Sequence, residues 1–125
     1  MTEMQVLTGT VVHGKRLGRT VGMPTANIQV SHKSLLPEAG VYATKILVDG
    51  HKFLSVTNIG LRPTVDDEQE VTVEAHILDF DGDIYGRDVT LEVHQFLRPI
   101  RKFASLEEVH AQVKKDIEKA RECLV

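Results

Sequence analysis

The chain has 125 residues, of which 42% are hydrophobic, 26% charged and 5% aromatic. This length and composition predict one globular domain over residues 1–125 and exclude a disordered or collagen-like chain. No apolar run approaches the length of a membrane span, and the first residues lack the basic start and apolar stretch of a secretory signal. We therefore expect a cytoplasmic protein with no membrane partner.

The charge balance argues against a nucleic-acid partner. Fifteen Lys and Arg residues against 18 Asp and Glu residues give a formal net charge of -3. Cations nevertheless concentrate in two turn-like windows, residues 15–19 and 98–102, and each window could bind a small anion. An isolated surface cation is more often simply solvated. Cys123 is the only cysteine, so neither a disulfide within the chain nor a cysteine-based zinc site is expected.

The amino-terminal half is predicted to consist of strands. Residues 6–13 are rich in β-branched side chains and are typical of a strand. Residues 14–27 contain three glycines and a proline, which predicts an ordered loop. Residues 41–48 and 53–59 form a predicted hairpin around Asp49-Gly50, where glycine supplies the positive φ that a tight turn requires.

The second half predicts two more strands and a helix. Residues 71–80 and 88–96 are both strand-like, and we expect them to pair with each other. Ser105 and Glu108 match a capping box, and apolar residues then recur every three or four positions as far as Leu124. This pattern predicts an amphipathic helix of about five turns. Five or six short strands before one helix favour an antiparallel barrel or sandwich with the helix packed against it.

The glycine-rich loop is the first candidate site. Glycines let a backbone approach a ligand closely, and neighbouring cations offset the charge of a phosphate. The loop is neither a Walker loop nor a dinucleotide fingerprint, and a plain connection between strands explains its glycines equally well. Thr25 and Asn27 are alternate residues and therefore project to one side, where they offer a hydroxyl and an amide oxygen. Mg²⁺ accepts such ligands and takes its remaining ligands from nucleotide phosphates and water.

With this loop the sequence resembles the riboflavin kinases, both the stand-alone enzymes and the carboxyl-terminal module of bacterial bifunctional FAD synthetases. The resemblance extends from Gly9 to Leu124. Its motifs, in order, are Pro24-Thr25-Ala26-Asn27, Gly40-Val41-Tyr42, Asn58-Ile59-Gly60 with Pro63-Thr64, Glu74-Ala75-His76-Ile77-Leu78-Asp79-Phe80 with Asp83-Ile84-Tyr85-Gly86, and Phe96-Leu97-Arg98-Pro99 with Lys102-Phe103. The resemblance implies a mainly β fold, a six-stranded antiparallel β-barrel with a carboxyl-terminal helix.

The resemblance also implies an activity: ATP- and Mg²⁺-dependent phosphorylation of the ribityl 5′-hydroxyl of riboflavin, giving FMN and ADP. Glu74 would accept the proton of that hydroxyl, a role for which a carboxylate within hydrogen-bond reach is chemically suited. His76 would have a supporting role at most. The other implied positions are Gly14, Arg19, Thr25 and Asn27 for the phosphates and the metal, Ile77, Asp79 (through its backbone) and Tyr85 for the nucleoside, and Arg98, Arg101 and Glu108 for the flavin.

Two alternatives come from other classes of protein. A non-catalytic barrel that carries or senses flavin would need neither the Thr25 and Asn27 pair nor Glu74. An oligonucleotide-binding barrel is disfavoured by the few aromatic residues and the negative net charge. No HxGH-type nucleotide motif occurs, so FAD formation is not expected. We expect a monomer, either a single-function kinase or one module of a larger bifunctional enzyme.

Overall fold

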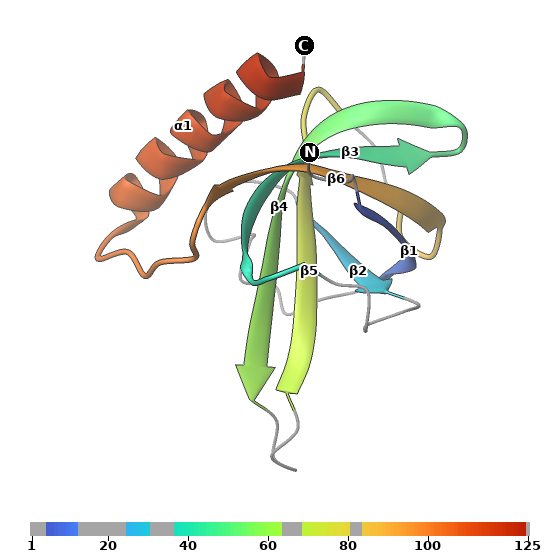
Figure 1. Ribbon diagram of the computed structural model, residues 1–125, viewed down its shortest axis with the longest axis horizontal. Helices are drawn as coiled ribbons and strands as arrows, with labels where there is room; N and C mark the ends of the chain where they lie inside the picture. Colours follow the sequence, from blue (N-terminus) through green and yellow to red (C-terminus); the bar gives the residue numbers. More distant parts are fainter. Residues whose placement is uncertain (1–4, 13–24, 31–36, 64–68, 81–83, 125) are drawn as a thin grey trace.

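A computed structural model describes most of the chain, namely residues 5–12, 25–30, 37–63, 69–80 and 84–124. Its strands close into a barrel in the order β1-β2-β5-β4-β3-β6, and every neighbouring pair is antiparallel. The elements are β1 (Gln5–Val12), β2 (Ala26–Val30), β3 (Gly40–Val48), β4 (His51–Pro63), β5 (Gln69–Ile77), β6 (Asp88–Arg98) and α1 (Leu106–Leu124). The helix lies against one side of the barrel (Figure 1). This architecture confirms the barrel and excludes the sandwich.

The β3–β4 hairpin confirms the clearest local prediction. Asp49 and Gly50 form its turn with φ values of 51° and 83°. Two consecutive positive φ values are the mark of a primed turn, whose twist matches that of the flanking strands. The pairing continues without interruption from Val48 opposite His51 to Gly40 opposite Ile59.

The predicted pairing of residues 71–80 with 88–96 is wrong. Strand β5 pairs with β2 and β4, whereas β6 pairs with β1 and β3. The segment between them is bonded to other strands at both ends, since the Leu78 N–H donates to the Leu54 carbonyl at 2.9 Å and the Gly86 N–H donates to the Val11 carbonyl at 2.9 Å. Ile84 is buried in the core. The connection from β5 to β6 therefore bonds to β4 at its start and to β1 at its end, and it does not turn back as a hairpin.

Strand β2 was not predicted, and its first two residues fall in the segment assigned to a loop. It is only five residues long, with Ala26, Ile28 and Val30 buried in alternation. Such a strand is hard to predict from the sequence, because it follows a proline and its apolar pattern is short. It closes the barrel by pairing with β1 on one edge and β5 on the other.

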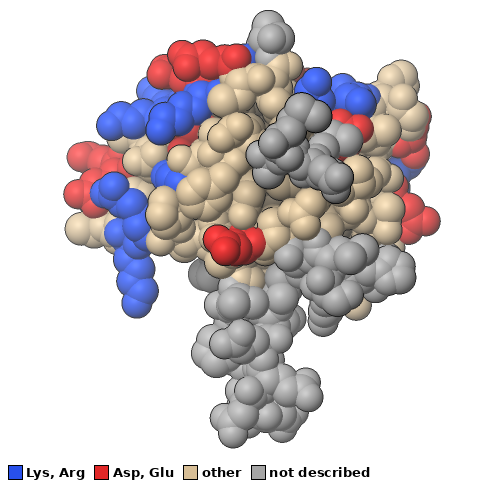
Figure 2. Space-filling view, in the orientation of Figure 1, with Lys and Arg blue, Asp and Glu red and all other residues tan. Residues whose placement is uncertain are grey.

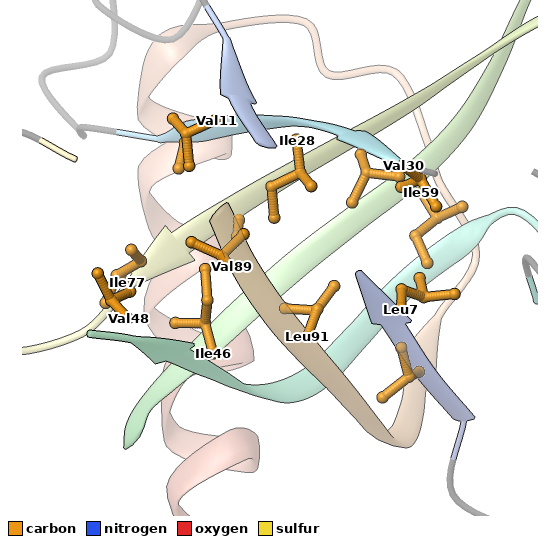
Figure 3. Packing of buried hydrophobic residues seen from close by; sticks show 14 of the residues in the cluster. Leu7, Val11, Ile28, Val30, Ile46, Val48, Ile59, Ile77, Val89 and Leu91 are labelled. Atoms are coloured by element: carbon orange, nitrogen blue, oxygen red, sulfur yellow. The ribbon is translucent and has the colours of Figure 1, made fainter. Parts of the chain in front are cut away.

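The barrel interior is filled by apolar side chains from all six strands (Figure 3). Among them, Thr44 forms a buried hydroxyl cluster on β3 and β4: its Oγ1 lies 2.6 Å from Ser55 Oγ and 2.8 Å from Thr57 Oγ1. All three residues are fully buried. Because the interior is packed with side chains, it leaves the outer face of the barrel as the place for a ligand.

The helix packs on the outer face of the barrel. Ala120 is fully buried against Val41, Ala43 and Val56, and Ile117 joins the same cluster. The capping box is confirmed, because the Glu108 N–H donates to Ser105 Oγ at 3.2 Å and the Glu108 carboxylate accepts from the Ala104 N–H at 2.9 Å. Within the described ranges, no helix is long and apolar enough to cross a membrane.

Candidate active site

Glu74 lies on the outer face of β5, because its neighbours Val73 and Ala75 are buried in the interior. Asn27 of β2 is its register partner on one side, and Asn58 of β4 is its partner on the other. Side chains directly opposite each other on antiparallel strands have Cβ atoms about 5 Å apart. Asn27, Glu74 and Asn58 therefore form a continuous polar row across three strands. Glu74 and Asn27 are half-buried and Asn58 is exposed.

The row continues towards the helix. Asn58 is the register partner of Val41 on β3, and Val41 is the partner of Arg98 on β6. Arg98 thus lies three strands from Glu74, about 14 Å away at the usual strand spacing. One lateral line on the outer face therefore joins the predicted base, Glu74, to a residue predicted to bind the flavin.

The residues predicted to hold Mg²⁺ lie at the far end of this row. Asn27 is beside Glu74, and Thr25 is exposed directly before β2. Among the described residues, no group of three or more His, Cys, Asp or Glu side chains could hold a metal by itself. The hydroxyl, amide and carboxylate oxygens that are present are nevertheless the hard ligands that Mg²⁺ prefers, and a cation here would need phosphate or water oxygens as well. The donor set fits a magnesium ion that arrives with a nucleotide.

The predicted phosphate-binding residues Gly14 and Arg19 lie outside the described residues, so their role stays a prediction. The three residues predicted to bind the nucleoside lie at the end of β5 and in the connection that follows. Ile77 points into the barrel and is only 8% exposed, so a ligand could reach only its backbone. Asp79 has a positive φ of 56°, and its carboxylate accepts from Arg121 at 3.2 Å. Tyr85 is half exposed.

The three residues predicted to bind the flavin have different surroundings. Arg98 and Arg101 both lie over the ring of Phe103, with guanidinium carbons 5.7 and 4.9 Å from its centroid. Arg98 is also paired with Asp116 of the helix at 3.0 Å, whereas Arg101 is exposed. Glu108 caps the first turn of α1 through the backbone of residue 104. The β6–α1 segment therefore gathers two cations around one aromatic ring.

Lys and Arg side chains are visible over α1 and the segment that leads into it (Figure 2). Sequence reasoning missed two residues near the candidate site. Asn58 was recognised only as part of a motif, and its place beside Glu74 depends on the pairing of β4 with β5. Asp116 could have been found from the sequence, because it lies four residues before Ala120 and therefore falls on the buried face of the helix.

A closed barrel with a packed interior and a carboxylate between two amides on its outer face defines a small β-barrel protein with a polar candidate site outside the barrel. Residues 2–124 match the model of the flavokinase family, described as riboflavin kinase. The chain belongs to that family.

Two similar proteins carry the name riboflavin kinase, and a third similar structure carries another name. A bifunctional riboflavin kinase/FMN adenylyltransferase from Listeria monocytogenes is 44% identical over 113 residues, which are 90% of this chain and 36% of that protein. The riboflavin kinase structure from Trypanosoma brucei superposes with a TM-score of 0.69 at 27% identity, covering 98% of this chain and 81% of the other. A Streptococcus pneumoniae structure named a macrolide-efflux protein gives a TM-score of 0.88 at 34% identity, covering 93% of this chain and 38% of the other. The chain thus spans little more than a third of the length of the curated relatives it matches.

Proposed function

We propose that this chain transfers the γ-phosphoryl group of ATP to the ribityl 5′-hydroxyl of riboflavin and releases FMN and ADP. The observation that carries the proposal is the register pairing of Asn27 with Glu74 on the outer face of the barrel. It brings a predicted ligand of the metal–nucleotide complex next to the predicted base, on neighbouring strands. Phosphoryl transfer requires this closeness, because the attacking oxygen and the transferred phosphorus must meet in line.

Glu74 orients the attacking hydroxyl and accepts its proton as the oxygen bonds to phosphorus. Strand β5 is paired on both edges at this residue, so the carboxylate is attached to a rigid backbone. Rigid placement matters because most of the rate gain in phosphoryl transfer comes from positioning and from stabilising charge. A general base adds about 10²-fold to 10⁴-fold.

Thr25 and Asn27 would hold Mg²⁺ through a hydroxyl and an amide oxygen. When bound, the metal neutralises phosphate charge on the nucleotide. The neutral side chains suit this role, since they leave the positive charge of the ion available to the phosphates. Gly14 and Arg19 would cradle the same phosphates, and Ile77, Asp79 and Tyr85 would contact the nucleoside.

The flavin would have its terminal hydroxyl at Glu74 and its ring system towards Arg98, and it would pass beside α1, because the helix covers Val41 between these two residues. The separation of about 14 Å between these residues suits an elongated substrate. Asn58 lies between them, where its amide can bond a hydroxyl of the ribityl chain. Arg101 and Glu108 would complete the flavin end.

The kinase step is proposed for residues 1–125 as one domain, acting as a monomer or as one module of a larger enzyme. The adenylyltransferase activity in the names of the bacterial relatives belongs to those longer proteins. A barrel that binds flavin without chemistry is the second candidate, and it would have no use for a carboxylate beside the metal–nucleotide position.

The decisive test is chromatography of the flavins after incubation with riboflavin, ATP and Mg²⁺. We expect FMN and ADP in equal amounts and no FAD. Flavin binding, seen as a change in riboflavin fluorescence, without any FMN would contradict the kinase and support the non-catalytic barrel.

A further inference from the structure

We propose that Asp116 is a positioning residue that holds the Arg98 guanidinium in the orientation in which it binds the flavin. This inference rests on the proposed riboflavin kinase activity. It concerns a carboxylate in the middle of α1 that lies outside the polar row at Glu74 and that the reaction itself does not use.

Asp116 is almost completely enclosed, with its side chain 3% exposed. Its Oδ1 accepts from Arg98 Nε at 3.0 Å and its Oδ2 accepts from Arg98 Nη2 at 3.0 Å, so the two groups meet fork to fork. Such a bidentate pair fixes the plane of a guanidinium as well as its position. Gln112, one turn earlier on the same helix face, donates to Asp116 Oδ1 at 3.0 Å and holds the carboxylate in this rotamer.

Docking of the helix does not rest on Asp116 alone. The apolar cluster of Ala120 and Ile117 against Val41, Ala43 and Val56 already attaches α1 to the barrel. A buried ion pair contributes about as much to stability as a hydrophobic pair of the same size, because both charges lose their hydration. The feature that a hydrophobic pair would not provide is a fixed, charged hydrogen-bond donor at Arg98.

Arg98 is also held from two other directions. Its Nη1 donates to the Pro99 carbonyl at 3.1 Å, and its cation lies over the Phe103 ring. Counting bonds to the described residues, the Pro99 bond and the two to Asp116 use three of the five N–H groups of a guanidinium, and the other two can serve a ligand. The side chain remains 17% exposed, so a ligand can reach these donors from solvent.

The position of Arg98 determines which part of the substrate its remaining N–H groups can bind. Arg98 lies on the same lateral line as Glu74, three strands away, so a substrate whose hydroxyl is at Glu74 reaches it by passing beside the helix-covered Val41. The polar edge of the flavin ring carries carbonyl oxygens, which accept hydrogen bonds from a guanidinium. A preset Arg98 binds that edge without first paying the entropy of ordering a long side chain.

The first test is Asp116→Asn, which keeps the size of the side chain and removes its charge. We expect the KM for riboflavin to rise about tenfold, the equivalent of one weakened charged hydrogen bond, while kcat and the KM for ATP stay within about twofold. Glu118→Gln, which removes an exposed carboxylate from the same helix, is the matched control and should leave all three constants unchanged. A folded Asp116→Asn protein with the parental KM for riboflavin would overturn the proposal.

The second test separates positioning from a purely structural role. In an Arg98→Lys background the bidentate pair with residue 116 cannot form. Asp116→Asn should therefore cause no further rise in the KM for riboflavin, even if it lowers the melting temperature. An equal rise in both backgrounds would show that Asp116 does not act through Arg98 and would overturn the proposal. Should Asp116→Asn fail to fold, Gln112→Leu carries the test: a smaller rise in KM is expected, and an unchanged KM counts against the inference. Absence of FMN formation by the parental chain would instead refute the proposed function.

Discussion

Asn27 and Glu74 are register partners on the outer face of the barrel, although 46 residues separate them in the chain. One belongs to a short strand after the glycine-rich loop and the other to the middle of a long strand. Closure of the barrel through β2 and β5 brings them together. The proposed metal ligand and the proposed base therefore lie side by side on neighbouring strands. Because they have different roles, substitutions at the two residues should have different effects on the kinetics.

Asn27→Ala should change the metal requirement of the reaction. Loss of the amide oxygen is expected to raise the Mg²⁺ concentration for half-maximal rate by about tenfold, the lower end of the effect seen even for residues that only support metal ligands. The measurement is the initial rate of FMN formation across a magnesium titration. Gln29→Ala, on the same strand and exposed, is the control and should leave the titration curve in place. An unchanged requirement in Asn27→Ala would contradict the assigned role.

Asn58→Ala should weaken the use of riboflavin without weakening the fold. The side chain is exposed, so the melting temperature should hold, but loss of one hydrogen bond near the base is expected to lower kcat/KM for riboflavin by about tenfold. Asn58→Asp should be worse, because a second carboxylate directly opposite Glu74 repels it. Steady-state kinetics of both variants check this, and equal, parental values would remove Asn58 from the site.

Thr44→Val should destabilise the barrel, although valine has nearly the same shape. The substitution leaves the buried hydroxyls of Ser55 and Thr57 without their partner, at a cost of about 1–3 kcal/mol. Urea unfolding followed by circular dichroism measures the difference. Thr90→Val, on the half-buried outer side of β6, is the control and should stay within about 0.5 kcal/mol of the parental value.

Glu92 should make the fold acid-sensitive. Burial alone raises the pKa of this carboxyl group, but hydrogen bonds from His94 at 3.0 Å and the ion pair with Lys52 at 3.1 Å outweigh it and bring the pKa below its ordinary value of 4.5. A carboxyl group with a lowered pKa in the folded state contributes stability above its unfolded pKa and loses it as the pH falls through the folded value.

The corresponding measurement compares the parental chain with Glu92→Gln in denaturant unfolding from pH 7 down to pH 3. The stability advantage of the parental chain should be constant above about pH 5.5 and should shrink below pH 4.5. A difference that stays constant through the acid range would show that the folded pKa of Glu92 is not lowered.

The sequence predicted those parts of the fold that depend on neighbouring residues. The Asp49-Gly50 turn, the capping box at Ser105 and the spacing of apolar residues in α1 are local signals, and the structure confirms each of them. The partner of β5 could not be predicted in this way. It depends on a ten-residue connection that bonds to β4 and β1 and buries Ile84, which strand patterns alone do not reveal.

In the candidate site, too, residue types could be predicted from local sequence, whereas their positions depend on how distant strands pair. Glu74 and Asn27 could be singled out as residue types within motifs, but they are register partners only because β2, a strand with a weak local signal, lies between β1 and β5. Asp116 shows the opposite case. Its place on the buried helix face was visible in the spacing, whereas its fork-to-fork pairing with Arg98 required the docked helix.

The central claim is that Glu74 acts as the base beside the metal–nucleotide complex, and Glu74→Gln tests it most directly. Single-turnover formation of FMN should be followed by chromatography at saturating riboflavin and Mg-ATP, with Glu118→Gln as the matched loss of a carboxylate. We expect a rate at least about 10²-fold lower for Glu74→Gln, with nucleotide binding retained, and a parental rate for the control. A near-parental rate in Glu74→Gln would contradict the claim.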